Sequence, residues 1–126
     1  MNVNEEARKM KLASPMVAAS SNELRNEALG LVIKSLTAKK DEIFAANAMD
    51  LEAAESTGVP APVVKRLKFN EDKLADCING IKLLIELPDP LNVTTLARQL
   101  DEGLDLFRVT CPIGVIGIIF EARPDA

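Results

Sequence analysis

Apolar side chains recur with a helical period through most of the first two thirds of the chain. After Ser20 and Glu23, which have the spacing of a capping box, apolar residues return every three or four positions. This pattern predicts an amphipathic helix over about residues 21–38. The stretch 38–58 repeats the pattern and ends at Gly58, a residue type that favours helix ends. We expect a second helix there, and a packing role for the residues of its common face: Ile43, Phe44, Asn47, Leu51 and Ala54.

Prolines delimit the next helical segments. One pair of prolines interrupts the pattern before a short helical turn at 63–67, and a second pair, Pro88 and Pro90, ends the helical region. Between them, Asn70 can cap a longer helix, because it precedes apolar residues spaced by four, three and four positions: Leu74, Ile78, Ile81 and Ile85.

From about residue 92 the pattern changes to an alternation with a period of two. The segments NVTTLARQL and LDLFRVTC are rich in β-branched residues and flank Asp101-Glu102-Gly103, a turn-like triplet. This predicts a two-stranded β-ribbon. Such a ribbon is marginal alone in water, so we expect it to pair with a third strand or a partner surface. Phe107, Val109 and Cys111 would share one face of it.

The final segment, CPIGVIGIIFEARPDA, contains the longest apolar run of the chain. Val115–Phe120 is typical of a strand buried on both faces, as in a parallel sheet covered by helices. No other segment has this unbroken apolar character, so the strands that should flank it are not in the sequence. Residues 121–125 would form the loop at its carboxyl end, where open α/β sheets bind ligands. In that loop Arg123 precedes a proline, and Asp125 could cap a helix.

Composition and charge narrow the classes of function. The 126 residues carry 19 acidic and 15 basic side chains, so the net charge of -4 favours neither nucleic acid nor a membrane surface as partner. The first residues lack a secretory signal, and the longest apolar run is too short to cross a bilayer. We therefore expect a cytoplasmic protein.

The cysteines and the absence of histidine restrict the chemistry further. Without histidine the chain has no Ser-His or Cys-His nucleophile pair, and without a CxxC pair it predicts neither a disulfide framework nor a metal site. Cys77 lies beside the apolar face of its helix, and Cys111 lies on a ribbon face. We expect both thiols to be packing residues rather than reactive groups.

Four segments, in order along the chain, are similar to one enzyme family: EIFAANAMDLEAAESTG, RLKFNEDKL, LPDPLN and GLDLFRVTCPIGVIGIIFEARPDA. They resemble the amino-terminal part of the gamma-glutamyl phosphate reductases (glutamate-5-semialdehyde dehydrogenases), a branch of the aldehyde dehydrogenase superfamily. The resemblance implies an α/β fold of the aldehyde dehydrogenase type. This chain would supply a mostly α-helical part, a β-ribbon and the first strand of a Rossmann-like parallel sheet.

The resemblance also implies a division of the chain into three segments. Residues 1–91 would be the helical part of the cofactor-binding domain, and 92–112 a β-ribbon similar to the superfamily's oligomerisation arm. Residues 113–126 would be the first strand and loop of the nucleotide-binding sheet. We therefore expect a homo-oligomer that forms through the 92–111 ribbon.

The activity that the resemblance implies is the NADPH-dependent reduction of gamma-glutamyl phosphate to glutamate 5-semialdehyde in proline biosynthesis, with glutamate kinase as a candidate functional partner. In such enzymes a cysteine thiolate attacks the acyl carbon, phosphate leaves, and hydride from the nicotinamide reduces the thioester. Neither Cys77 nor Cys111 lies in a segment similar to the nucleophile's motif. We expect that cysteine and most of the cofactor site beyond Ala126, and we expect the chain alone to be an inactive fragment.

Arg123 is the candidate site residue of this chain. In related aldehyde dehydrogenases the loop after this strand supplies an asparagine that helps to form the oxyanion hole, and Arg123 falls near that position. A guanidinium there could hold a phosphate or carboxylate with two parallel hydrogen bonds. The alternative is an arginine that pairs with Glu121 or caps a helix end.

Two other interpretations remain. Another aldehyde dehydrogenase branch fits less well, because FEARPDA replaces the usual asparagine-containing loop. A non-catalytic module that acts only by oligomerisation or interaction with partner chains fits the helices and the ribbon. Binding of NADPH by a longer form of the chain would distinguish the enzyme from the module.

Overall fold

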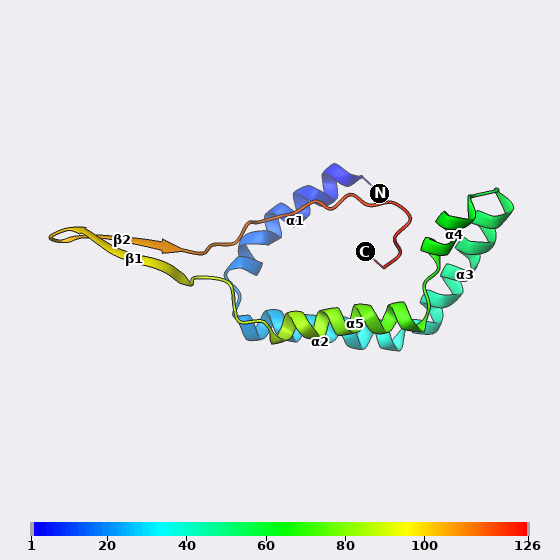
Figure 1. Ribbon diagram of the computed structural model, residues 1–126, viewed down its shortest axis with the longest axis horizontal. Coiled ribbons are helices and arrows are strands. Elements are labelled where there is room, and N and C mark those ends of the chain that lie inside the picture. Colours follow the sequence, from blue (N-terminus) through cyan, green and yellow to red (C-terminus); the bar gives the residue numbers. More distant parts are fainter. Residues whose placement is uncertain (1, 126) are drawn as a thin grey trace. The chain divides into compact units, whose positions relative to one another are not determined.

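The structure is a computed structural model that describes residues 2–125. Along these residues, helices are followed by a pair of strands (Figure 1): α1 Val3–Ala18, α2 Asn22–Ala38, α3 Lys40–Ser56, α4 Ala61–Leu67, α5 Glu71–Glu86, β1 Thr94–Asp101 and β2 Leu104–Val109. The chain divides into two compact units. The first combines the residues up to Asn22 with Pro88–Gly117, and the second combines Glu23–Leu87 with the residues from Ile118 onward.

Helix α1, in the first unit, is not predicted from the sequence. Its N-cap is Asn2, whose side chain accepts a hydrogen bond from the N–H of Asn4 at 3.2 Å. Glu5 and Glu6 in the first turn suit the positive end of the helix dipole. None of its residues is buried, and its large apolar side chains are exposed. The helix contains Pro15 near its end, and a proline usually interrupts a helical pattern in a sequence.

The predicted β-ribbon is confirmed. Strands β1 and β2 pair antiparallel, with Ala97 opposite Phe107, and Gly103 at the turn has a φ of +76° that favours glycine. Thr110 closes the base of the ribbon, because its hydroxyl donates to the Pro90 carbonyl at 2.6 Å and accepts from the Val93 N–H at 2.9 Å. Every strand residue is exposed.

The expectation that Cys111 is a packing residue is wrong for this chain. Cys111 lies beyond the end of β2 and is exposed, as are Phe107 and Val109 of β2. The physical reason is that the ribbon has only two strands, so no third strand within residues 2–125 covers these side chains.

The helices predicted at 21–38, 38–58 and 63–67 are confirmed as α2, α3 and α4. Helix α3 ends in a Schellman motif: the N–H of Gly58 donates to the Glu55 carbonyl, and the N–H of Val59 donates to the Ala54 carbonyl. Gly58 has a φ of +73°, which explains why glycine suits this position.

The fourth predicted helix is confirmed as α5, with the expected cap. The side chain of Asn70 accepts a hydrogen bond from the Lys73 N–H at 3.2 Å. Leu74, the first residue of the predicted apolar face, is 4% exposed. Helices α2 and α5 run side by side in Figure 1, and the side-chain amide of Asn26 donates to the Ile85 carbonyl at 3.3 Å.

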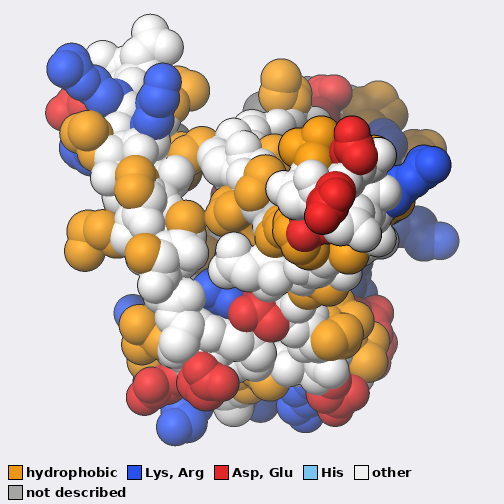
Figure 2. Space-filling model, turned by 90° about the vertical axis from the view of Figure 1, so that its left-hand side faces the viewer, with side chains coloured by type: hydrophobic (Ala, Val, Ile, Leu, Met, Phe, Trp, Pro, Cys, Tyr) orange, Lys and Arg blue, Asp and Glu red, His pale blue; other side chains and the backbone are white. Residues whose placement is uncertain are grey.

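The prediction of a doubly buried strand at 115–120 is wrong for this chain. These residues belong to no strand, and their large apolar side chains are exposed, Ile119 completely. A strand needs a partner for its backbone hydrogen bonds, and the described residues supply no third strand to pair with this segment. Figure 2 shows how many apolar side chains are uncovered on one face of the molecule.

No helix within residues 2–125 has the length and apolar character needed to span a membrane.

Candidate functional site

The loop at 121–125 is attached to helix α5, which belongs to the same unit. The carboxylate Oδ1 of Asp125 lies 3.4 Å from the Nζ of Lys73. The Cys77 thiol donates to the backbone carbonyl of Asp125 at 3.8 Å. The loop turns at Ala122, whose φ of +52° is uncommon for a residue other than glycine. Two side chains of α5 therefore fix the end of the loop that carries Arg123.

Helix α5 presents both attachment residues on one face, because Lys73 and Cys77 are four positions apart. Lys73 is fixed in turn, since its Nζ donates to the backbone carbonyl of Arg66 in α4 at 3.1 Å. Cys77 is half-buried. Its thiol binds the loop backbone, which agrees with a structural rather than a nucleophilic use of this residue.

Arg123 has a carboxylate partner in the structure, but this partner is Asp125 and not Glu121. Nε of Arg123 lies 3.7 Å from Oδ1 of Asp125, and the arginine side chain is 59% exposed. The nitrogen in this ion pair is Nε, the one next to the aliphatic part of the side chain. The arrangement therefore leaves the two parallel donors of the guanidinium accessible to a second anion.

The environment of Asp125 lowers the pKa of its carboxyl group. The hydrogen bond from its own backbone N–H contributes most, and the Lys73 ammonium and the Arg123 guanidinium act in the same direction. Asp125 is thus a carboxylate at neutral pH, as both ion pairs require.

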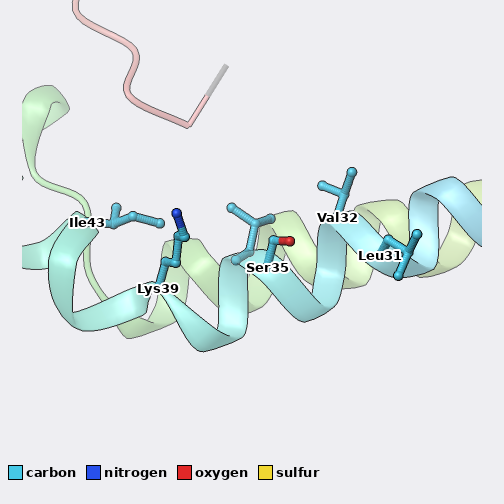
Figure 3. A pocket seen from close by; sticks show the side chains of 6 residues that line it. Leu31, Val32, Ser35, Lys39 and Ile43 are labelled. Atoms are coloured by element: carbon cyan, nitrogen blue, oxygen red, sulfur yellow. The ribbon is translucent and has the colours of Figure 1, made fainter.

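A second candidate, a shallow apolar pocket of about 300 Å³, lies on the surface of α2 and at the start of α3 (Figure 3). Its lining is Leu31, Val32, Ser35, Leu36, Lys39 and Ile43. This lining provides one cation and one hydroxyl but no carboxylate or thiol. Within residues 2–125, no three His, Cys, Asp or Glu side chains lie close enough together to hold a metal ion.

Sequence reasoning identified Arg123 but not Lys73, because the contact joins residues 52 positions apart. One feature of the sequence could have indicated the ion pair with Lys73. Asp125 lies two positions after Arg123 and places a carboxylate in the loop, where a cationic side chain can pair with it.

The chain is similar over its whole length to curated gamma-glutamyl phosphate reductases. The protein of that name from Pelotomaculum thermopropionicum is 51% identical over 126 residues, which are 100% of this chain and 29% of that protein. The protein of the same name from Acetivibrio thermocellus gives the same identity and the same coverage. The chain thus spans about 29% of the length of the curated relatives that it matches. No family model matches the chain.

Solved structures agree with this similarity. A gamma-glutamyl phosphate reductase from Saccharomyces cerevisiae is 38% identical, with a TM-score of 0.90 over 99% of this chain and 32% of that chain. One from Thermotoga maritima is 32% identical, also with a TM-score of 0.90, over 96% of this chain and 29% of that chain. The resemblance to the amino-terminal part of gamma-glutamyl phosphate reductases is therefore confirmed. The expected fold of mostly α-helices with a β-ribbon is confirmed as well, whereas the expected strand at 115–120 is not formed.

Proposed function

We propose that this chain is part of a cytoplasmic gamma-glutamyl phosphate reductase of proline biosynthesis. The reaction converts the acyl phosphate, NADPH and a proton into glutamate 5-semialdehyde, phosphate and NADP. The similarity over the whole chain to reductases with 51% identity supports this proposal. The similarity concerns about 29% of those proteins, so the activity belongs to the enzyme that contains the chain.

Within that reaction we assign Arg123 to the substrate. Gamma-glutamyl phosphate carries a phosphate and a carboxylate, and a guanidinium binds either group with two parallel hydrogen bonds. The observation that carries this assignment is the geometry of Arg123, which pairs with Asp125 through Nε and is 59% exposed. Its two terminal nitrogens are the ones that would hold the anionic group.

The residues described here do not form a site for the nicotinamide cofactor. A Rossmann site needs parallel strands and a helix N-terminus that faces the pyrophosphate. Residues 115–120 belong to no strand, and within residues 2–125 no helix follows them. We therefore expect the nicotinamide cofactor to be bound by other parts of the enzyme that contains this chain.

Kinetics of an enzyme that contains this chain test the role of Arg123. Arg123→Lys keeps the charge but loses the bidentate geometry, so we expect a loss of about tenfold in kcat/KM for the acyl phosphate. Arg123→Ala should lose more. Arg8→Ala, which removes an exposed arginine of α1, is the matched control and should stay near the parent value. Near-normal kinetics of Arg123→Ala would contradict the assignment.

We further propose that the 92–111 ribbon mediates self-association of this protein. Both faces of the ribbon expose apolar side chains of β2, Leu104 and Leu106 on one face and Phe107 and Val109 on the other. A two-stranded ribbon of this kind is marginal in water unless a partner covers it, and its unpaired edges can receive another strand. This property is shared by the enzyme and by a non-catalytic interaction module, so it supports association without deciding between them.

A further inference from the structure

One carboxylate oxygen of Asp125 lies close to two cationic side chains from different parts of the chain. Oδ1 of Asp125 lies 3.4 Å from Nζ of Lys73 and 3.7 Å from Nε of Arg123. The side chains of Lys73 and Asp125 are 29% and 25% exposed, whereas that of Arg123 is 59% exposed. Lys73 and Asp125 are thus partly shielded from water, whereas Arg123 is exposed to the solvent.

Lys73 is held in place by helices α4 and α5. Lys73 lies in the first turn of α5, where its backbone N–H binds the capping side chain of Asn70. Its ammonium also binds the Arg66 carbonyl of α4 at 3.1 Å. The position of the ammonium is therefore determined by two helices, while the loop at 121–125 has no secondary structure of its own to hold Arg123.

We propose that Lys73 and Asp125 are positioning residues, which orient the guanidinium of Arg123 toward the anionic group of the substrate. The inference rests on the proposed role of Arg123. Asp125 forms its ion pair with Nε, so this contact does not use the two terminal nitrogens, which would bind the anionic group. Asp125 pairs with Lys73 as well as with Arg123. Its single negative charge is therefore divided between two cations, and it can orient the guanidinium without cancelling the positive charge of the cluster. The three side chains keep a net charge of +1, which favours an anionic ligand.

The test measures KM and kcat for the acyl phosphate in an enzyme that contains this chain. Lys73→Met removes the ammonium and should raise KM about tenfold, with kcat changed by less than about threefold, because substrate binding rather than chemistry is affected. Lys73→Arg keeps a cation beside Asp125 and should recover most of the loss. Lys82→Met, at an exposed position of the same helix, is the matched control and should leave KM unchanged.

Asp125→Asn separates positioning from simple charge. This substitution removes a negative charge, which makes the cluster more positive, so an effect of charge alone would lower KM. Positioning predicts the opposite, because the arginine loses the group that orients it. A KM at or below the parent value for Asp125→Asn would overturn the proposal. The same variant serves as the test if Lys73→Met does not fold.

A double substitution distinguishes this inference from the proposed function. In an Arg123→Ala background, Lys73→Met should change KM by less than about twofold, because residues that act through one another are not additive. Full multiplication of the two effects, or a normal KM for Lys73→Met alone, would overturn the positioning role and leave the role of Arg123 intact. A normal KM for Arg123→Ala alone would overturn the proposed function, and the inference with it.

Discussion

The side-chain oxygen of Asn47 accepts a hydrogen bond from the backbone N–H of Phe69 at 2.8 Å, which connects the middle of α3 to the linker between α4 and α5. The amide nitrogen of the same side chain donates to the Leu67 carbonyl at 2.9 Å. Asn47 is only 8% exposed, and the ring of Phe69 packs near that of Phe44, with centroids 6.2 Å apart. One polar side chain therefore satisfies two backbone groups, one at the end of α4 and one in the linker that follows, and holds this segment against α3.

Substitution of Asn47 should destabilise the chain strongly. Asn47→Ala leaves the Leu67 carbonyl and the Phe69 N–H without these partners, which should lower the free energy of unfolding by roughly 2–4 kcal/mol. Urea unfolding measures this change, and hydrogen exchange at the Phe69 amide should become faster. Asn79→Ala, at an exposed position of α5, is the control and should change stability by less than about 0.5 kcal/mol. Equal effects of the two substitutions would show that the bonds of Asn47 do not stabilise the fold.

Replacement of two glycines by alanine should change the stability of the chain in opposite directions. Gly58 has a φ of +73° after α3, so Gly58→Ala should cost about 1 kcal/mol of stability. Gly80 lies within α5, and nothing lies within 4 Å of the Cβ that Gly80→Ala would add. That substitution should stabilise the chain by about 0.5–1 kcal/mol, because alanine favours the helix more than glycine does. Thermal unfolding of both variants checks the signs, and a stabilising Gly58→Ala would contradict the assigned helix end.

The parts of the fold that the sequence predicts correctly depend on local signals. The cap at Asn70 and the helix ending at Gly58 are set by residues within a few positions of one another, as is the turn at Gly103. Alternation with a period of two likewise predicts the ribbon without any knowledge of its surroundings. These features follow from backbone preferences that a short segment carries by itself.

The features that the sequence does not reveal depend on distant partners. Val115–Phe120 has the composition of a buried strand, yet a strand forms only where another chain segment supplies hydrogen bonds. Lys73 is an unremarkable lysine in the helix sequence, and its role appears only when the loop with Asp125 folds against α5. Helix α1 was not predicted, and it continues through Pro15, a residue type that usually marks the end of a helix in a sequence.

Protonation of Asp125 should release the loop from α5. Its pKa is lowered in the folded chain, so its stabilising contribution is complete above the ordinary pKa of an aspartate. The contribution is lost as the pH falls through the lowered pKa of the folded state. Carboxyl NMR shifts of Asp125 measure this titration directly. Lys73→Met should move the midpoint upward, toward the ordinary value, and an unchanged midpoint would show that the ammonium does not act on Asp125.

The two thiols should differ in reactivity. Cys111 is exposed, whereas Cys77 is half-buried and bonded to the Asp125 carbonyl. A disulfide reagent should therefore modify Cys111 first, and Cys111→Ser should remove the fast phase. In an enzyme that contains this chain, replacement of either cysteine by serine should leave turnover per folded molecule nearly intact, because neither is expected to be the nucleophile. A loss of turnover by orders of magnitude in a folded variant would contradict that expectation.

The uncovered apolar residues should cause the chain to self-associate. Phe107 on the ribbon is 60% exposed, and Ile119 in the extended segment is fully exposed. Burial of one such side chain contributes roughly 1.5–3 kcal/mol, and about 1.4 kcal/mol corresponds to a factor of ten in affinity. Phe107→Lys and Ile119→Lys should therefore each weaken association by roughly tenfold to a hundredfold, as measured by light scattering over a range of concentrations. Met49→Lys, at an exposed position of α3, is the control and should change association by less than about threefold, because a single exposed apolar residue on a helix is ordinary. A parent chain that stays monomeric at every concentration would contradict association through these surfaces.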